Sequence, residues 1–592
     1  MVKSLSDRSA ILPLMKKSGG AMHVVTIKRR HGEREYESTL VRRSIREGKR
    51  VRKETLANLT RLPAEAIEAV RRALAGETLV TAEDAFQIER SLPHGHVAAV
   101  LGTARKQGLE RLLGRERSRE RDLCLAMVCQ RLLRAGSKLS ATRRFGLTTL
   151  GEELAVADAS EAELLSAMDW LLARQERIEA ALARRHLTEG GFVLYDLSSS
   201  YLEGRKCPLA ALGYPRDGKR GKLQISYGLT CSPEGRPVAV EVFDGKTHDD
   251  KTLPRALERI KQRFGIERVV VCGDRGMITE ANIEVLRQHG FDWITALRAP
   301  QVQALVETGA LQLSLFDERN LAEIASERYP GERLVVCRNP HVARERTRKR
   351  EALLAATEQE LTKVKASVDN PRGRLHGKPA GQIGERAGRV VNRYKVAKHF
   401  QLTIADGRFE YRRNEQAISE EAALDGFYVL RTSVGEDALT PQAVVRAYKL
   451  LAHAERAFRA MKSPELEIRP LHHRLEDRVR AHVFLCMLAY AVRFELEQRL
   501  APLLFKDDSP LAPADPVAPA QRSSAAKRKA ATKQTEDGLP VSSFRDLLDA
   551  LATLCRNRIR LRDSQASFDQ LTEANDLQRR AFELLELNPN RV

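Results

Sequence analysis

The spacing of apolar residues changes several times along the chain and marks its main segments. Over positions 1–60, apolar and polar side chains alternate in short stretches typical of β-strands, with Glu47-Gly48-Lys49 as a turn. Over positions 61–188, apolar residues recur at helical spacing. We therefore predict a basic β-rich segment over 1–60, then a helical region over 61–188 whose arginine-flanked helices suit either DNA binding or core packing. The predicted strands cover positions 22–27, 36–45 and 51–56.

A mixed α/β pattern follows over residues 189–300. Three strand-like stretches precede a helical run, a second apolar strand, a helix and a last strand. The continuous apolar run at 268–272 is typical of a strand buried on both faces. This order predicts a mixed sheet flanked by helices. The elements are expected at 191–197, 222–230, 237–243, 252–264, 268–272, 279–289 and 291–296.

Residues 300–440 interrupt this pattern with a long charged helix at 343–368 and strands at 395–411 and 426–432. Strong helical spacing returns over 440–500. The proline-rich and lysine-rich stretch 505–540 is too poor in apolar residues to fold, so we predict a linker with solvated lysines. A helical C-terminal tail is expected over 541–592.

Composition adds a clue to partners and location. Lys and Arg number 100 against 79 Asp and Glu, a formal net charge of +21, which favours a polyanion such as nucleic acid; a generally basic proteome is the alternative. The longest uncharged apolar run, 481–492, is shorter than the roughly 20 residues of a membrane span. The stretch 1–17 lacks the apolar segment of a signal peptide. Eight cysteines without a CxxC pair argue against structural zinc and fit a cytoplasmic protein.

Two aspartates lie at positions where α/β sheets commonly bind ligands. Asp196 lies in the first apolar strand of the α/β segment, and Asp274 follows the apolar strand at 268–272. A carboxylate among strand residues is costly to bury unless it is paired or binds a metal, and strand ends are where open α/β sheets bind ligands. The alternatives are an Asp196 paired to a neighbouring Arg or Lys, and an Asp274 that serves as a helix cap or turn residue.

The helix expected at 446–462 contributes a third carboxylate. Tyr448, Glu455 and Lys462 are spaced by seven and seven, so they share one face of a continuous helix, with Arg459 on the same side. The alternative is a surface helix in which Glu455 and Arg459 form only an i,i+4 ion pair.

Three carboxylates in a basic surround, without a Cys or His ligand set, suit a hard divalent cation, above all Mg²⁺. Two such ions clamp the attacking and leaving oxygens of a phosphodiester. Lys462 and Arg459 would then hold the phosphate backbone.

These residues resemble the bacterial insertion-sequence transposases of the DDE type, in the group with a Y-x2-R-x3-E-x6-K signature. Here the signature positions hold Tyr448, Leu451, Glu455 and Lys462, so a leucine replaces the arginine; Arg446 and Arg459 are candidate substitutes. Blocks at 213–219, 243–249 and 273–277 are also similar to the family, with Lys246 in place of its usual Asn. The resemblance covers about 190–300 and 425–495.

The resemblance implies a multi-domain α/β protein with an RNase H-like core. Asp196 would lie on the first strand, Asp274 after the fourth and Glu455 on a late helix. The core would comprise 189–300 and 425–504, interrupted by a strand-rich insertion domain at 301–424.

The resemblance also implies a DNA transposase. The N-terminal part, 1–190, would bind the terminal inverted repeats, and Asp196, Asp274 and Glu455 would hold two Mg²⁺ ions, with Mn²⁺ as a substitute. A water would cleave each element end, and the released 3′-hydroxyl would attack target DNA. DNA contacts are expected from Tyr448, Arg459, Lys462 and Arg446.

Related enzymes imply a homodimer on double-stranded DNA, at the bacterial nucleoid and away from membranes. A Mg²⁺-dependent nuclease on the same fold and a catalytically decayed DNA-binding protein are the alternatives. RNA binding through residues 22–60 is a weaker one.

Overall fold

A computed structural model describes residues 20–591, except residues 33, 78–84, 508–509, 512 and 563–565. The expectation about a signal peptide, which concerns positions 1–17, lies outside the described residues. The chain forms two compact units. The N-terminal unit comprises Met1–Ser91 with Asn557–Gln570, and the main unit comprises Leu92–Arg556 with Leu571–Val592.

The N-terminal unit contains the three strands that alternation predicts. They form an antiparallel sheet in the order β1-β2-β3, with helix α1 beside β1. The bounds are β1 (Met22–His31), β2 (Arg34–Glu47), β3 (Arg50–Asn58) and α1 (Ala64–Leu74). Every residue of β3 is exposed, including Arg50, Arg52 and Lys53.

A second small sheet corrects two helical expectations. It has the order β16-β15-β4, with β4 (Phe86–Pro93), β15 (Cys555–Leu561) and β16 (Ser567–Leu571). Strand β4 lies inside the stretch 61–188 and the other two lie inside the tail 541–592, so the helical expectation is wrong at these places. The sequence of β15 places arginine at every second residue, which is the period of a strand and agrees with its place in this sheet.

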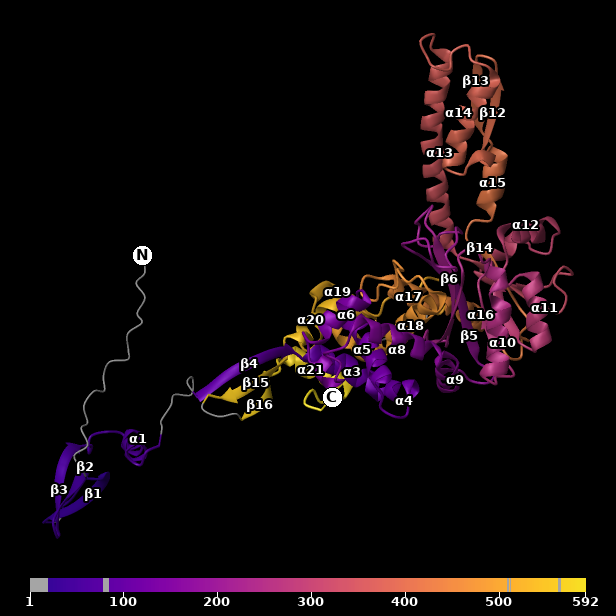
Figure 1. Ribbon diagram of the computed structural model, residues 1–592. Coiled ribbons are helices and arrows are strands. Elements are labelled where there is room, and N and C mark those ends of the chain that lie inside the picture. The colour runs from indigo at the N-terminus through magenta and orange to yellow at the C-terminus, as the bar shows by residue number, and fades with distance from the viewer. Residues whose placement is uncertain are drawn as a thin grey trace. The chain divides into compact units, whose positions relative to one another are not determined.

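The main unit is built on one eight-stranded mixed sheet, in the order β10-β11-β14-β9-β8-β5-β6-β7 (Figure 1). Strand β5 is parallel to β8 and β8 to β9, whereas β6 is antiparallel to both β5 and β7. Numbered in chain order, these five strands have the 3-2-1-4-5 order of the expected RNase H-like core. Their bounds are β5 (Phe192–Tyr201), β6 (Gln224–Cys231), β7 (Pro237–Asp244), β8 (Val270–Cys272) and β9 (Asp292–Ala296).

The stretch expected to be a strand-rich insertion, 301–424, is divided between the sheet and a projection. Strands β10 (Leu321–Ile324) and β11 (Arg333–Arg338) extend the main sheet, and β14 (Phe427–Thr432) joins them to β9. The apolar run of β11 is buried, which explains why it belongs to the sheet. The expectation of one separate insertion is therefore wrong at these strands.

The projection itself is mainly helical, and its elements stand beside α13 (Figure 1). It has its own apolar core around Leu361, Ile383 and Phe409. The elements are α13 (Pro340–Asp369), α14 (Ala380–Arg393), β12 (Phe400–Ala405), β13 (Arg408–Arg413) and α15 (Glu415–Ala423). Within the projection, residues 340–423, all of which the structure describes, only the β12–β13 hairpin agrees with the expectation of a strand-rich insertion.

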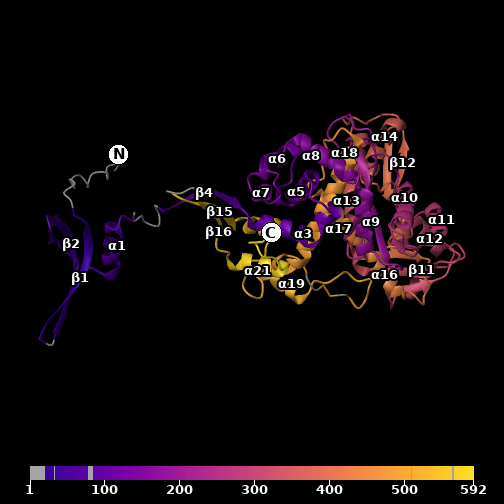
Figure 2. The ribbon, with the colours of Figure 1, turned by 60° about the horizontal axis from the view of Figure 1, so that its bottom comes forward.

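Helix α18 (Glu476–Arg499) is the buried centre of the helical part. It contacts α3, α5, α8 and β7, and Figure 2 shows it beside α5 and α8. None of the described helices has the length and apolar content to cross a membrane. The surrounding helices are α3 (Gly95–Lys106), α4 (Leu109–Leu113), α5 (Arg119–Arg134), α6 (Lys138–Phe145), α7 (Leu150–Glu153), α8 (Glu161–Leu172) and α9 (Gln175–His186).

The expected linker at 505–540 also contains a helix, α19 (Ser524–Thr532), so the expectation that it does not fold is wrong there. Lys529, expected to be solvated, is buried and donates hydrogen bonds to the carbonyls of Ala501 and Lys506. The remaining helices are α10 (Leu253–Glu258), α11 (Glu280–His289), α12 (Ala299–Glu307), α16 (Pro441–Lys449), α17 (Leu451–Lys462), α20 (Phe544–Ala552) and α21 (Asp576–Leu585).

A close backbone approach at Gly213 gives a first testable prediction. A Cβ atom there would lie 1.9 Å from the carbonyl oxygen of Gly245 and 2.7 Å from Nε2 of Gln224. Because backbone must move to relieve this clash, Gly213→Ala is expected to lower the free energy of unfolding by about 2 kcal/mol or more. Gly388→Ala, in helix α14 with open space around it, should instead raise it by about 0.5–1 kcal/mol. Urea unfolding of both variants checks the contrast, and equal losses would contradict it.

Candidate active site

The two predicted aspartates lie at the same level of neighbouring strands. In the parallel pair of β5 and β8, Leu194 is aligned with Cys272. Asp196 and Asp274 each come two residues later, so both lie at the level where β8 ends, although β5 itself continues to Tyr201. Adjacent strands are about 5 Å apart, which brings the two side chains close together.

Asp196 is half-buried and has no ion pair among the described residues. Its Oδ1 accepts a hydrogen bond of 2.8 Å from the backbone N–H of Leu197. Burial raises the pKa of Asp196 to about 7, and the charges of Asp274 and Glu455 add to the rise. The alternative of a carboxylate paired to a neighbouring Arg or Lys is therefore not what the structure contains. Burial is thus the main cause of the raised pKa of Asp196, the two other carboxylates add to it, and the charge of Arg216 lowers it.

Asp274 is exposed in the turn that precedes α11. Its Oδ1 accepts hydrogen bonds of 3.0 Å from the backbone N–H groups of Gly276 and Met277. A Cβ atom at Gly276 would lie 3.4 Å from Oδ1 of Asp274 and 3.7 Å from Oδ2 of Asp249, so both carboxylates border this glycine. Asp274 thus has the turn role considered as its alternative, and this turn also fixes its carboxylate beside the strand end.

The third carboxylate lies on a shorter helix than expected. Helix α16 ends at Lys449 and α17 begins at Leu451, so the stretch 446–462 is not one continuous helix. The expectation of one continuous helix is therefore wrong at Leu450, although this residue keeps right-handed helical dihedrals between the two helices. Tyr448 is nevertheless near the carboxylates: burial raises its pKa to about 12, with further contributions from Asp274 and Glu455.

On α17 the charged side chains have partners within the chain, and the ion pair considered as the alternative for Glu455 is present. Glu455 and Arg459 form an ion pair of 3.2 Å between exposed side chains. Lys462 donates a 2.7 Å hydrogen bond from Nζ to Oγ of Ser198 on β5, and burial lowers the pKa of Lys462 to about 8. Lys462 therefore attaches α17 to the strand that carries Asp196.

A cavity of about 620 Å³ opens between β5 and α17. Asp196, Glu455, Arg459 and Lys462 line it together, whereas Asp274, Tyr448 and the exposed Arg446 are not among its lining residues. The structure therefore unites four of the seven predicted site residues in one cavity and leaves Asp274 and Tyr448 as electrostatic neighbours.

Sequence reasoning assigns no role to three charged residues of this cavity, namely Arg216, Asp217 and Arg469. Buried Asp217 forms a 2.9 Å ion pair with Arg469, and Arg216 pairs with Asp249. The block at 213–219 is the available signal, since it contains both Arg216 and Asp217.

The donor chemistry of the site suits a divalent cation. The three carboxylates offer only oxygen ligands, which Mg²⁺ and Mn²⁺ prefer, and a cation would relieve the repulsion that raises the pKa of Asp196. Across the described parts of the chain, no group of three or more His, Cys, Asp or Glu side chains is arranged to hold a metal ion. The chemistry of the residues fits a metal, and the structure defines no coordination geometry for it.

Comparison with known proteins gives two family matches. Residues 208–492 match the transposase DDE domain, and residues 24–85 match the N-terminal domain of IS1634 family transposases. No curated protein matches the chain. A cryo-EM structure of the piggyBac transposase synaptic complex with hairpin DNA shares 10% identity, over 77% of this chain and 76% of that chain, with a TM-score of 0.31. This similarity is too weak to identify a shared fold.

The matched DDE domain spans β6 to most of α18 and contains Asp274 and Glu455. It implies dependence on a divalent metal ion. The Tyr-Arg-Glu-Lys signature is not confirmed, because Leu451 stands at its arginine position. The DDE match includes the sequence blocks at 213–219, 243–249 and 273–277 on which the resemblance rests. The chain therefore belongs to the DDE-type insertion-sequence transposases and is a DNA-cleaving transposase.

Proposed function

We propose that Asp196, Asp274 and Glu455 form the catalytic centre of this transposase. The observation that supports it is that Asp196 forms no ion pair with any described residue, while burial raises its pKa, Asp274 and Glu455 add to the rise, and Arg216 offsets it only in part. A structural carboxylate would be expected to have a cationic partner, because an unpaired charge is costly to bury. Asp196 has no such partner within the described ranges, so we infer a functional role for its charge.

These carboxylates would hold Mg²⁺, with Mn²⁺ as a substitute, and the bound ions would stabilise charge on the attacked phosphate. Lys462 and Arg459 would bind non-bridging phosphate oxygens of the scissile strand, and Tyr448 and Arg446 would contact DNA beside it. The Arg469–Asp217 and Arg216–Asp249 pairs would keep the cavity wall in place.

The proposed reaction has two steps. The oxygen of a water attacks the phosphorus at the element end, and the bond from phosphorus to the 3′-oxygen breaks to leave a 3′-hydroxyl on the element. This hydroxyl then attacks a phosphodiester of target DNA, joining the element to the target and releasing the target's own 3′-hydroxyl. The same cavity serves both displacements.

The N-terminal part, 1–190, would bind the terminal inverted repeats, and two copies would act as a homodimer on paired ends at the nucleoid. The exposed basic side chains of β3 support a DNA-binding role for the N-terminal unit. A basic strand ribbon in solvent suits contact with phosphates.

The test is cleavage and joining by the purified full chain. We would incubate it with its flanking genomic DNA ends, a plasmid target and Mg²⁺, and repeat the reaction with a chelator in place of Mg²⁺. Joined products that require the metal would support the proposal. Cuts without joining would identify a nuclease. Specific binding to the ends without cutting, in Mg²⁺ or Mn²⁺, would identify a decayed DNA-binding protein.

A further inference from the structure

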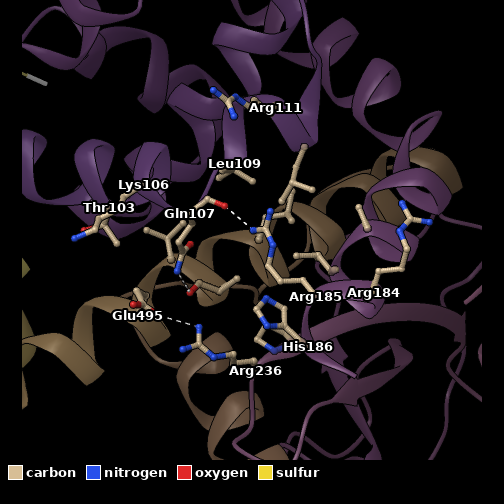
Figure 3. A pocket seen from close by; sticks show the side chains of 18 of the residues that line it. Thr103, Lys106, Gln107, Leu109, Arg111, Arg184, Arg185, His186, Arg236 and Glu495 are labelled. Carbon is tan, nitrogen blue, oxygen red and sulfur yellow. Dashed lines mark hydrogen bonds and ion pairs between the residues drawn. The ribbon is translucent and has the colours of Figure 1, made fainter. Parts of the chain in front are cut away.

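A second cavity, of about 850 Å³, lies in the helical part of the main unit (Figure 3). Its walls come from the junction of α3 and α4, from α9, from the start of β7 and from the last turns of α18. We call it the basic pocket. It has no lining residue in common with the cavity between β5 and α17.

The basic pocket has a strongly uneven charge. Eight of its lining residues are Lys or Arg, and Glu495 is the one acidic residue among them. His186 also lines it, and burial together with Arg236 and Arg185 lowers the pKa of His186 to about 4, so this imidazole is neutral at pH 7. Such an excess of positive charge is unfavourable unless an anion compensates it.

Several cations of the basic pocket already have partners within the chain. Arg236 and Arg499 form ion pairs of 2.8 and 2.7 Å with Glu495. Arg177 donates hydrogen bonds of 2.8 Å to the carbonyls of Leu112 and Leu113. A small anion bound deep in the cavity would therefore have to displace existing interactions.

Further contacts fix the side of the pocket next to α3. Arg185 donates a 2.6 Å hydrogen bond to the carbonyl of Gln107, as Figure 3 shows, and Lys106 pairs with Glu586. These interactions hold α9 and the C-terminal segment against the end of α3. These contacts do not fill the cavity, and the positive charges of the side chains that make them are largely compensated.

Three other cations of the basic pocket differ from these in having no partner among the described residues. Arg111, Arg115 and Arg184 are exposed, and none of them has an ion pair or a side-chain hydrogen bond within the part of the chain that the structure describes. Figure 3 shows Arg111 near the top of the cavity and Arg184 at its right. Three unpaired guanidinium groups around one opening would bind an anion that lies across it.

The residues that line the basic pocket offer no aromatic ring on which a nucleic-acid base could stack. No Phe, Tyr or Trp lines the basic pocket in the described chain, so a nucleoside would find no aromatic partner. Guanidinium groups bind phosphate oxygens through paired N–H donors. The arrangement therefore suits a chain of phosphates that spans the opening.

We propose that the basic pocket is a second DNA-contact site, at which Arg111, Arg115 and Arg184 hold backbone phosphates of duplex DNA without reading its sequence. This inference rests on the proposed function in taking DNA as the polyanion. Helix α9 leads directly into β5, the strand of Asp196, so DNA held by Arg184 would be anchored to an element that continues into the catalytic core.

The salt dependence of DNA affinity tests this site. We would measure the dissociation constant of a 20-base-pair duplex of arbitrary sequence for the full chain between about 50 and 300 mM salt. The pocket variant is Arg111→Glu with Arg184→Glu. The matched control is Arg319→Glu with Arg328→Glu, which changes the net charge equally at two exposed arginines outside the pocket. Since each lost phosphate contact lowers the slope by about 0.9, the pocket variant should lose about 2 from the slope and the control much less.

Equal slopes for the pocket and control variants would overturn the proposal. Tight binding of tripolyphosphate that depends on Arg111 and Arg184, with an unchanged DNA slope, would also overturn it in favour of a small-anion site. A lysine double variant at the same positions should keep most of the slope, because it keeps the charge. End joining measured on the same preparations separates the proposed transposase function from the proposed DNA contact at the basic pocket. If joining occurs and the slope of the pocket variant is unchanged, only the DNA contact at the pocket is refuted. A reduced slope supports that contact even if no joining occurs.

Discussion

Replacing Glu455 by glutamine is expected to reduce end cleavage and joining by about 10²–10³-fold or more, whereas Arg459→Gln should reduce them by about tenfold at most. The two side chains form one exposed ion pair on α17, so each substitution breaks the same contact. They differ in what else is lost. Glutamine at 455 removes a negative charge near Asp196, whereas glutamine at 459 would remove one proposed phosphate contact.

This pair of variants separates the two interpretations of α17. If Glu455 only completed a surface ion pair, the two substitutions would have equal and small effects, since exposed pairs contribute about 0–1 kcal/mol. Single-turnover cleavage of a labelled element end in Mg²⁺ measures the difference. Unchanged thermal unfolding of both variants would show that the fold is intact. Equal rates for the two would remove Glu455 from the catalytic centre.

The positions of Asp196 and Asp274 could be predicted because each carboxylate directly follows a short apolar run, although Asp196 lies within β5 and not at its end. Each apolar run ends in a carboxylate, and the parallel register of β5 and β8 then aligns the two residues. The position of Tyr448 could not be derived in this way. The spacing of seven assumed a continuous helix, and the break at Leu450 depends on tertiary packing that no local pattern reveals.

Long-range pairing explains the other differences between sequence and structure. Strands β10 and β11 join the main sheet through β14, which is about 90 residues further along the chain than β11. Strands β4 and β15 pair across most of the sequence. The burial of Lys529 could not be predicted from the local sequence either. It depends on the carbonyls of Ala501 and Lys506, which reach the lysine side chain only in the folded chain.

Behind the active-site cavity, a buried group of cations gives the last prediction. Arg131 donates hydrogen bonds of 3.1 and 3.2 Å to the carbonyls of Leu466 and Glu467, in the segment that carries Arg469 into the cavity. Lys138 lies beside it and donates from Nζ to Nδ1 of His482 over 3.1 Å. Burial lowers the pKa of His482 well below its usual value, so this imidazole is neutral and accepts the bond.

Lys138→Met is expected to raise the free energy of unfolding at pH 7 by about 3 kcal/mol. Burial, and then the charge of Arg131, lower the pKa of Lys138 from 10.5 to about 7, and no described carboxylate pairs with it. The unfolded chain therefore holds this proton more tightly than the folded one. It follows that the stability of the wild type rises with pH between about 7 and 10.5, whereas the methionine variant should lack most of this rise.

Chemical denaturation at pH 7, 8.5 and 10 measures both effects, with Lys527→Met as a control at an exposed lysine of α19. The control should change neither the stability nor its pH dependence by more than about 0.5 kcal/mol. A wild type whose stability is flat over this range, or a methionine variant that is less stable, would mean that Lys138 is charged and compensated in the fold. A more stable variant with normal end cleavage would instead show that the cation at 138 opposes folding and that the hydrogen bonds of Arg131 suffice to hold the segment of Arg469.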